Sequence, residues 1–251
     1  MTHAANPQDE PPAPGPADRE AALALLRVGN IDVEGRMVDA SNATLFCSIT
    51  TGAASAQCVY KPIRGERPLW DFPDGSLAGR ELAAFEVSEA SGWDIVPPTV
   101  MREGPFGAGM VQLWIDIDET VDLERLVRSE RPQLRRMALF DAVINNADRK
   151  GGHLLPVGGG AHIFGIDHGI AFHREDKLRT LLWGWRGRKL SQTEREVLEK
   201  LRFDPDLDER LLELLTTREV TATHRRIDRL LRTGVFPSPS GDWPAIPWPP
   251  F

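Results

Sequence analysis

The sequence is short of cysteine and of long apolar runs, and both shortages exclude classes of protein. Its two cysteines, Cys47 and Cys58, cannot form a zinc site alone, and their spacing matches no metal motif, which favours a reduced cytoplasmic protein. No segment approaches the ~20 apolar residues of a membrane-spanning helix. The N-terminal segment also lacks the basic and then apolar layout of a secretory signal, so we expect neither a membrane span nor export.

Net positive charge is missing too, since the chain carries a formal net charge of −7 and has a pI of about 5.4. A broad nucleic-acid surface needs a basic face, so nucleic acid is disfavoured as a partner. Only 5 of the 30 basic residues are lysines, so a lysine inside an apolar stretch is informative.

Proline marks both ends of the chain. Residues 1–18 contain five prolines and no apolar period, which predicts a disordered N-terminal tail. Residues 236–251 contain six prolines, which exclude a helix or a central strand, yet this C-terminal tail is also rich in aromatic residues. Two interpretations stay open: the tail packs in an extended form across the body, or it is loosely attached.

Between the tails, strands come first and helices follow. The expected strands are 31–39, 44–50, 57–62, 99–102 and 109–115, with helices at 19–29 and 77–91. The later helices are expected at 120–129, 132–147, 191–202, 206–216 and 218–233, interrupted by a strand pair at 153–156 and 162–166. This order predicts an α+β fold with a β-rich N-lobe at 19–116 and a mainly helical C-lobe at 117–235.

Lys61 closes an apolar strand segment, Cys58-Val59-Tyr60-Lys61-Pro62. An unpaired buried ammonium is very costly, so this lysine must reach water, a carboxylate or an anionic ligand. Glu81, on the expected helix 77–91, would fix the ammonium for a phosphate, with Glu86 as the competing partner. The alternative is that Lys61 lies at a strand end and extends to solvent.

The segment 134–153 is the most specific one in the chain. Residues 134–147 are apolar on almost every face, which predicts a buried helix, and they run into the sequence Asn145-Asn146-Ala147-Asp148-Arg149-Lys150-Gly151-Gly152-His153. Such a polar cluster cannot lie unpaired in dry protein. A helix C-terminus with a capping loop would explain the glycines and one asparagine, but not the full set.

Another aspartate, Asp167, follows the apolar run Ile163-Phe164-Gly165-Ile166 and precedes a turn at Gly169. A carboxylate at a strand end, next to a second acidic loop, suits a magnesium ion that also binds phosphate oxygens. An Asp-x-Gly turn in a hairpin is the alternative for this piece taken alone.

The serial order of these pieces predicts a phosphotransferase of the kinase type. It runs from a strand lysine through a helix glutamate and an Asn/Asp loop to a strand-end aspartate. In such an enzyme a lysine binds phosphate, a glutamate positions the lysine, one aspartate orients the acceptor hydroxyl and another holds the metal. Phosphoryl transfer depends on positioned charge more than on covalent chemistry, so these residues suffice.

At these residues the chain resembles the atypical kinases related to phosphatidylinositol 3-/4-kinases, particularly the type II phosphatidylinositol 4-kinases, as a bacterial, actinobacterial-type member. The resemblance covers roughly residues 40–185. The segments that carry it are Val59–Pro62, Arg80–Phe85, Asp141–Arg149 and Gly165–Phe172. It implies a two-lobed protein-kinase-like fold that uses ATP and Mg²⁺.

The resemblance also implies a role for each matching residue. Lys61 would contact phosphate with Glu81 as its partner, Asp148 would orient the acceptor, and Asp167 would bind the metal. Five residues after Asp148, where the family usually has an asparagine ligand, this chain has His153, and imidazole is a poorer ligand for Mg²⁺ than a carbonyl oxygen. An oxygen of Asn146 or Asn145 could serve instead, so the expected metal ligands are Asp167, His153 and Asn146.

The nucleotide pocket is expected around the same lysine. A phosphate-covering hairpin is expected at 38–45, where backbone N–H groups near small residues could approach a phosphate, although an ordinary Ser-Asn turn fits equally well. The candidate residues of this hairpin are Ser41, Asn42, Ala43 and Thr44. A hinge between the lobes is expected at 110–116, with adenine against the backbone of Gln112, Leu113 and Trp114. The expected apolar walls are Val59 and Ile166.

Residues 173–190 interleave basic residues with Trp183 and Trp185, which is compatible with an anionic acceptor or with association at a membrane surface. The alternative is a solvated loop whose tryptophans pack on the helical lobe. We therefore expect an ATP- and Mg²⁺-dependent kinase that acts on a hydroxyl acceptor, whether lipid, small molecule or protein. Two alternatives are a nucleotide-binding regulatory module without catalysis and an AMP transferase. The sequence does not fix the oligomeric state.

Overall fold

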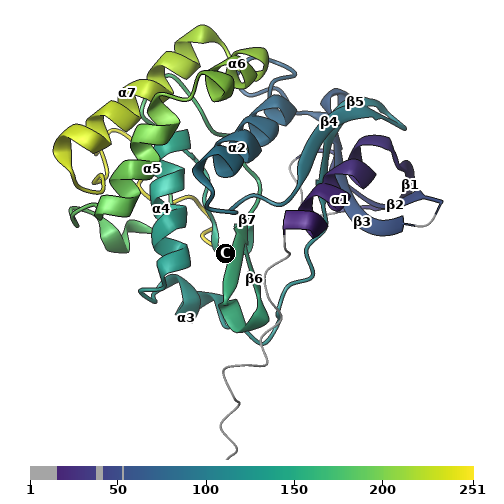
Figure 1. The fold of residues 1–251 in the computed structure, drawn as a ribbon, viewed down its shortest axis with the longest axis horizontal. Helices are drawn as coiled ribbons and strands as arrows, with labels where there is room; N and C mark the ends of the chain where they lie inside the picture. The colour runs from purple at the N-terminus through teal and green to yellow at the C-terminus, as the bar shows by residue number, and fades with distance from the viewer. Residues whose placement is uncertain (1–15, 38–41, 53) are drawn as a thin grey trace, which may run out of the picture.

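The computed structural model describes residues 16–37, 42–52 and 54–251. Figure 1 shows two lobes side by side, one built around a β-sheet and the other mainly of helices, with α2 (Leu77–Ser91) between them. The predicted two-lobed α+β fold is confirmed.

The β-rich lobe is a five-stranded antiparallel sheet in the order β1-β2-β3-β5-β4. Its strands are β1 (Asn30–Arg36), β2 (Leu45–Thr51), β3 (Ala54–Pro62), β4 (Thr99–Gly104) and β5 (Gly107–Leu113). Side chains of a strand alternate between the two faces of a sheet. Cys58 and Tyr60 are therefore buried on the face that α1 (Pro16–Val28) covers, while Val59 and Lys61 lie on the opposite face.

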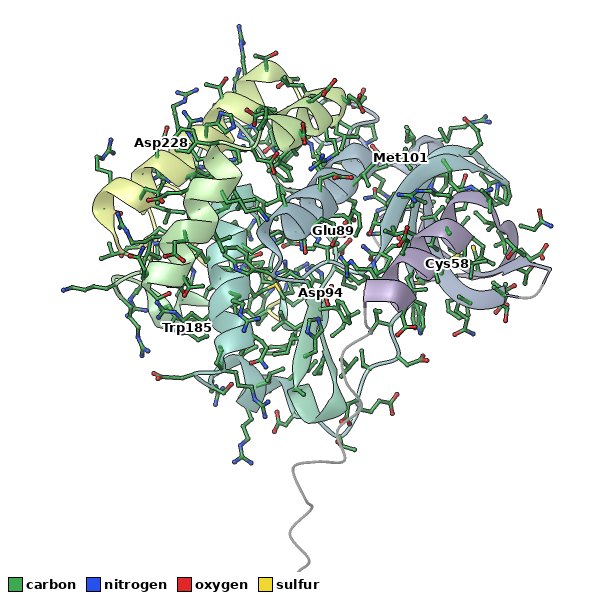
Figure 2. The ribbon with its side chains drawn as sticks, viewed as in Figure 1. Cys58, Glu89, Asp94, Met101, Trp185 and Asp228 are labelled. Carbon is green, nitrogen blue, oxygen red and sulfur yellow. The ribbon has the colours of Figure 1, made fainter. Side chains whose placement is uncertain are left out.

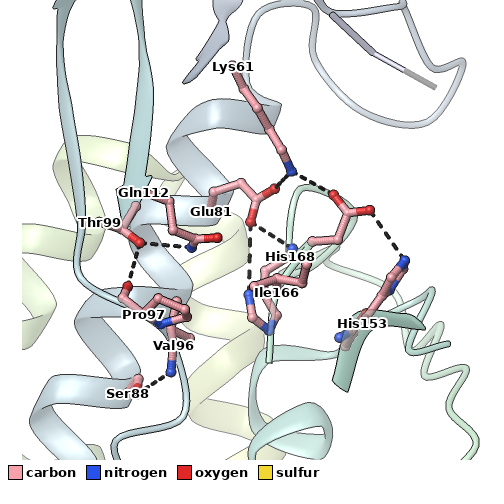
Figure 3. A network of polar contacts seen from close by, with 12 residues as sticks. Lys61, Glu81, Ser88, Val96, Pro97, Thr99, Gln112, His153, Ile166 and His168 are labelled. Atoms are coloured by element: carbon pink, nitrogen blue, oxygen red, sulfur yellow. Dashed lines mark hydrogen bonds and ion pairs between the residues drawn. The ribbon is translucent and has the colours of Figure 1, made fainter. Parts of the chain in front are cut away.

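The helix α2 couples the two lobes. It ends at Ser91 and is capped by Gly92, whose left-handed φ of 69° suits a residue without a Cβ. The hydroxyl of Ser88 then accepts hydrogen bonds from the backbone N–H groups of Ile95 (2.8 Å) and Val96 (3.0 Å), which directs the chain toward β4 (Figure 3). Because α2 contacts the sheet and the helical lobe together, most of its residues are buried.

The helical lobe is built on α4 (Pro132–Ile144), whose side chains are buried on nearly every face, as its sequence predicts. The other helices are α3 (Leu123–Val127), α5 (Gln192–Arg202), α6 (Pro205–Leu214) and α7 (Thr217–Thr233), and the hairpin consists of β6 (Leu154–Val157) and β7 (His162–Gly165). Ser191 and Thr216 form capping boxes at the starts of α5 and α7. Figure 2 places Trp185 and Asp228 in this lobe, with Trp185 in its core, and Cys58 across the molecule in the sheet.

The elements differ from the sequence-based expectations mainly at their ends. The buried helix stops at Ile144 rather than at residue 147, because Asn145 adopts a left-handed conformation with φ 55° and caps it. The helix expected at 120–129 is only α3, which Asp122 caps by accepting a hydrogen bond from the N–H of Arg125. The first helix begins at Pro16, so residues 16–18 are not part of a disordered tail, and residues 1–15 lie outside the described residues.

The C-terminal tail packs against the helical lobe in an extended form. All of residues 236–251 are described, and none of them lies in a helix or a strand. Phe236 is buried, with the Arg135 guanidinium 4.6 Å from its ring centroid, and its N–H donates to the carbonyl of Arg188 (2.9 Å). Within the described part of the chain, the structure contains no helix of the length and apolarity that crossing a membrane requires.

Candidate functional site

Lys61 stands at the end of β3, on the sheet face turned toward α2. Pro62 closes the strand, and Lys61 pairs in register with Met110 of β5. Its Nζ donates to Glu81 Oε1 at 2.6 Å and to Asp167 Oδ1 at 2.6 Å, so the lysine does not extend to solvent. Figure 3 shows its side chain pointing down to Glu81 between the two lobes. Two carboxylates, from Glu81 and Asp167, therefore meet at the ammonium group of Lys61, although the three residues lie far apart in the sequence.

Glu81 is the buried member of this cluster, with only 2% of its surface exposed. One carboxylate oxygen accepts from Lys61, and the other accepts the backbone N–H of His168 at 2.8 Å. Glu86, the competing candidate, instead forms an ion pair with Arg210 at 2.7 Å. Glu81 therefore ties the strand lysine to the loop that follows β7.

The charges in the cluster stabilise one another. Burial disfavours the charged form of Lys61, but attraction by Asp167 and Glu81 outweighs it and raises the pKa of the lysine. The positive charge of Lys61 in turn lowers the pKa of Asp167 well below its usual range. Asp167 has a left-handed backbone with φ 65°, unusual for a residue with a Cβ, and 51% of its side chain is exposed. Asp167 is thus a carboxylate that is paired with Lys61 and has one side open to solvent.

The loop after α4, residues 145–153, lies directly beside Asp167. Arg149 donates from its guanidinium to the backbone carbonyls of Ile166 (3.0 Å) and His153 (3.3 Å), so it joins this loop to the residue before Asp167. The same guanidinium forms an ion pair with Asp141 at 2.9 Å, and both side chains are 0% exposed. This buried pair fixes the relative position of the two loops.

Asp148 is the partly exposed carboxylate of that loop. Its side chain is 23% exposed and lies 3.1 Å from the ammonium of Lys150. Its backbone N–H donates to Asn146 Oδ1 at 3.0 Å, which holds the turn. Asp148 is therefore a loop carboxylate that is partly open to solvent.

Two histidines lie next to the carboxylates, and the pKa of each is lowered. Burial is the main cause of the lowered pKa of His153 and of His168, and the positive charge of Arg149 lowers both further. His168 is fully buried, and since arginine can only donate, its Nε2 accepts from Arg149 at 2.6 Å. The Nε2 of His153 lies 3.3 Å from Asp167 Oδ2, and its buried Nδ1 has no hydrogen-bond partner among the described residues.

The expected metal ligands are only partly brought together. Asp167 and His153 meet, but Asn146 lies outside the cluster, because its amide nitrogen donates to Asp141 (3.0 Å) and its oxygen accepts from Asp148. Asn145 also lies outside the cluster, since its side-chain oxygen accepts the backbone N–H of Lys177 (2.9 Å). Among the residues that the structure describes, no group of three His, Cys, Asp or Glu side chains is placed to hold a metal.

The described part of the phosphate-covering hairpin is tied to the loop after β3. Ser41 lies outside the described residues. The side chain of Asn42 accepts the N–H of Arg67 (2.8 Å), the N–H of Ala43 donates to the carbonyl of Gly65 (3.1 Å), and Thr44 is buried. The N–H of Ala43 therefore already has an internal acceptor.

The expected hinge donors are also engaged within the protein. The N–H of Leu113 donates to the carbonyl of Pro98 (2.9 Å), and that of Trp114 donates to the carbonyl of Gln57 (3.0 Å). The side chain of Gln112 is buried and donates to Thr99 (2.9 Å), as Figure 3 shows. A ligand edge against this segment would have to use other backbone groups. The two expected wall residues, Val59 and Ile166, are both partly exposed.

The stretch 173–190 is only partly a free basic surface. Lys177 is buried, bonded to Asp71 at 2.6 Å, and Arg188 is paired with Glu130. Trp185 packs in the helical core, and the Nε1 of Trp183 donates to the carbonyl of Ala245 (2.8 Å). The tryptophans thus pack on the helical lobe, while Arg186 and Lys189 stay exposed.

A hollow of about 770 Å³ lies away from this cluster, near Lys177 and the start of α7. It is lined by both signs of charge, and none of the expected site residues lines it. A volume alone supplies no chemistry, whereas Lys61, Glu81 and Asp167 supply positioned charge. We therefore place the candidate site at Lys61.

Three residues that shape the site carry no role in the sequence-based expectations: Asp141, Arg149 and His168. One signal for Asp141 was present, because a lone aspartate in a helix that is apolar all round must have a buried partner. Nothing in the sequence indicates that Arg149 is that partner, since the pair depends on how the loop folds back over α4.

No family model matches the chain. Among curated proteins, "Protein Rv2133c" of Mycobacterium tuberculosis (strain ATCC 25618 / H37Rv) is 43% identical over 273 residues, a match that spans 93% of this chain and 96% of that protein. Its name states no activity.

Solved kinase structures share the fold of this chain. The Golgi casein kinase matches with a TM-score of 0.60 and 16% identity over 87% of this chain and 74% of that chain. A structure of the Golgi casein kinase with Mn/ADP bound gives a TM-score of 0.61 and 16% identity over 86% and 75%. Hydra Fam20 with sugar gives 0.61 and 16% over 88% and 89%. Identities this low show the fold alone, which is kinase-like.

Proposed function

Because the chain belongs to the family of Protein Rv2133c and has an atypical kinase-like fold, we propose that it is a phosphotransferase that moves the γ-phosphoryl group of ATP to a hydroxyl acceptor. The single observation that supports this most strongly is the convergence of Lys61, Glu81 and Asp167 at 2.6 Å contacts between the two lobes. These are the residue types that phosphoryl transfer uses, in the order along the chain that kinases use them.

In the proposed reaction Lys61 binds the phosphates of ATP. Glu81 keeps hold of Nζ from its buried position, so the ammonium stays in place when its contact with the exposed Asp167 is exchanged for phosphate oxygens. A positioned cation stabilises the charge that develops on the transferred group, and no reorganisation of solvent is needed.

Asp148 is the proposed proton acceptor. The acceptor hydroxyl gives its proton to the Asp148 carboxylate as its oxygen bonds to the γ-phosphorus, and ADP leaves with the electrons of the broken bond. Lys150 lies 3.1 Å from that carboxylate and adds positive charge beside the transferred group.

A divalent metal is part of the proposal. Asp167 offers a half-exposed carboxylate, and the donor set suits an ion that takes few protein ligands, as Mg²⁺ does when it takes the rest from phosphates and water. His153, beside Asp167, makes Mn²⁺ an alternative to Mg²⁺. When bound, such an ion neutralises phosphate charge.

Turnover of radiolabelled ATP with Mg²⁺ or Mn²⁺ tests the proposal, with Asp148→Asn as the inactive comparison. We expect phosphate release or transfer that falls by at least about 100-fold in this variant. Arg128→Gln, in an exposed pair with Glu124, is the matched control and keeps the wild-type rate. Turnover that is absent, or equal in Asp148→Asn and wild type, contradicts the proposal.

A second candidate is a nucleotide-binding regulatory module without catalysis. The observation that favours it is His153, which occupies the place of an oxygen ligand and lies against Asp167. This reading expects ATP to raise the melting temperature while no turnover is measured. Turnover that is present in the wild type and lost in Asp167→Asn would contradict this second candidate.

The acceptor class is the finer part of the proposal. The segments around Lys61, Asp148 and Asp167 support a phosphatidylinositol 3-/4-kinase-like subtype, and the fold comparison alone supports no acceptor. Phosphatidylinositol vesicles, dephosphorylated casein and a simple sugar are three separate arms of the same assay. Labelling of the vesicles alone supports the lipid-kinase subtype.

A further inference from the structure

The C-terminal tail ends on the same loop that carries Asp148. The carbonyl of Pro250 accepts the backbone N–H of Gly151 at 2.8 Å. The ring of Phe251 lies directly against Gly151, since a Cβ added there would be 2.1 Å from Phe251 Cδ1. Figure 1 shows the C mark beside β7, at the centre of the molecule. The tail thus covers a residue only three positions after Asp148.

The tail reaches that loop along a defined track. The ammonium of Lys177 makes a cation–π contact with Trp243, 4.5 Å from the ring centroid. It makes a second with Trp70 of the other lobe, at 4.9 Å. Further along, the carbonyl of Ala245 accepts two hydrogen bonds, from the N–H of Thr180 (3.1 Å) and the Nε1 of Trp183 (2.8 Å). These contacts hold an extended segment by its backbone, as a bound peptide is held.

The attachment is firm at its start and weak at its end. Lys177 and Thr180 are both buried, so the contacts of Trp243 and Ala245 rest on fixed groups. Phe251, in contrast, keeps 52% of its surface exposed, and Trp248 keeps 84%. A segment with few buried apolar contacts opens at low free-energy cost, so the end of the tail can leave the loop without unfolding the lobe.

We propose that residues 243–251 form a removable cover over the acceptor side of the catalytic loop. The proposal rests on the proposed function, because it takes Asp148 as the residue that an acceptor hydroxyl must reach. The nucleotide side is bounded by Lys61 and Asp167, while the tail lies at Gly151, beyond Asp148 along the same loop. Pro250 and Phe251 therefore contact the loop that carries Asp148, three residues beyond that carboxylate.

The test uses full-length variants and a readout that needs no catalysis. Lys150, paired with Asp148, is labelled with an amine-reactive reagent, and its rate is normalised to exposed Lys200 on α5. We expect Phe251→Ala and Trp243→Ala to raise the relative labelling of Lys150 by at least about threefold, because the covered state loses population. Trp248→Ala, in the same tail but 84% exposed, should leave it unchanged.

Phosphate release from ATP is measured on the same variants, with water as the acceptor. A removable cover predicts turnover equal to or above wild type in Phe251→Ala. Unchanged labelling of Lys150 overturns the proposal. Raised labelling with turnover reduced more than about threefold also overturns it, because the tail then supports the loop instead of covering it. Turnover absent from every protein, wild type included, contradicts the proposed function, while the labelling still decides whether the tail is a cover.

Discussion

Two ion-pair clusters lie next to each other in this molecule and differ in exposure. In the inner cluster, Arg149 and Asp141 are both 0% exposed. In the outer cluster, Lys61 and Asp167 are 18% and 51% exposed. The backbone carbonyl of Ile166, bonded to Arg149, belongs to the residue just before Asp167, so the two clusters share a loop.

The difference shows which cluster can serve a ligand. Arg149 donates to Asp141, to His168 and to two backbone carbonyls, so its donors are already used inside the protein. The outer cluster keeps an exposed carboxylate and an ammonium with a third proton to donate. The inner cluster therefore positions the loops, and the outer cluster is the part that chemistry can use.

The largest effect is expected from breaking the inner cluster. Asp141→Ala leaves the Arg149 guanidinium buried without its counter-ion, which should lower the free energy of unfolding by about 3–5 kcal/mol. Chemical denaturation measures it. Asp228→Ala, which breaks the more exposed pair with Arg202, is the control and should cost no more than about 1 kcal/mol. Equal losses in the two variants would show that the inner pair is not structural.

Removing the positive charge of the outer cluster should instead reduce turnover and leave the protein folded. Lys61→Met keeps the apolar stem but removes the charge, so we expect ATP turnover to fall by at least about 100-fold while the protein stays folded. The thermal shift caused by ATP should also disappear. A variant that turns over ATP at the wild-type rate would show that Lys61 only contributes to stability.

A smaller effect is expected at the residue that positions the lysine. Asp167 and Glu81 both raise the pKa of Lys61, and Glu81→Gln removes the second of these charges yet leaves an oxygen that can accept from Nζ. Turnover should fall by about tenfold. Glu86→Gln, on the same helix but paired with Arg210, should leave turnover unchanged. If the two variants reduce turnover alike, the effect belongs to α2 as a whole and not to Glu81.

The smallest effect is a pH dependence of stability. Burial lowers the pKa of His168 and of His153, so the unfolded chain binds protons that the folded one does not. The contribution of the histidines to the free energy of unfolding is therefore fully present above their usual pKa, near pH 6.5. On acidification it falls by up to about 1.4 kcal/mol per pH unit for each histidine. Denaturation at pH 7.5 and 5.5 measures it. His168→Gln should reduce the difference, and an unchanged difference would exclude His168 as a source.

Local sequence determined much of the fold. Gly92 caps the end of α2 and Pro62 ends β3, because glycine and proline act on the backbone of their own position. The lysine, the glutamate and Asp167 were identifiable because each is a charged residue on an apolar element, which requires a partner.

Other features depend on tertiary packing that no local pattern encodes. The N–H groups of Leu113 and Trp114 donate to residues 98 and 57, which only the assembled sheet brings near. Asn146 bonds to Asp141 of the buried pair and not to Asp167, because Asp141 lies five residues before it, near the end of α4. The contact of Phe251 with Gly151 joins residues 100 positions apart and leaves no trace in either segment.

The most direct test of the central claim is a crystal structure of the protein with ADP and a divalent metal. We expect Lys61 Nζ to contact a phosphate oxygen while it keeps its bond to Glu81, and Asp167 to bind the metal at the same nucleotide. A nucleotide bound elsewhere, with the Lys61–Asp167 pair intact at 2.6 Å, would contradict the account.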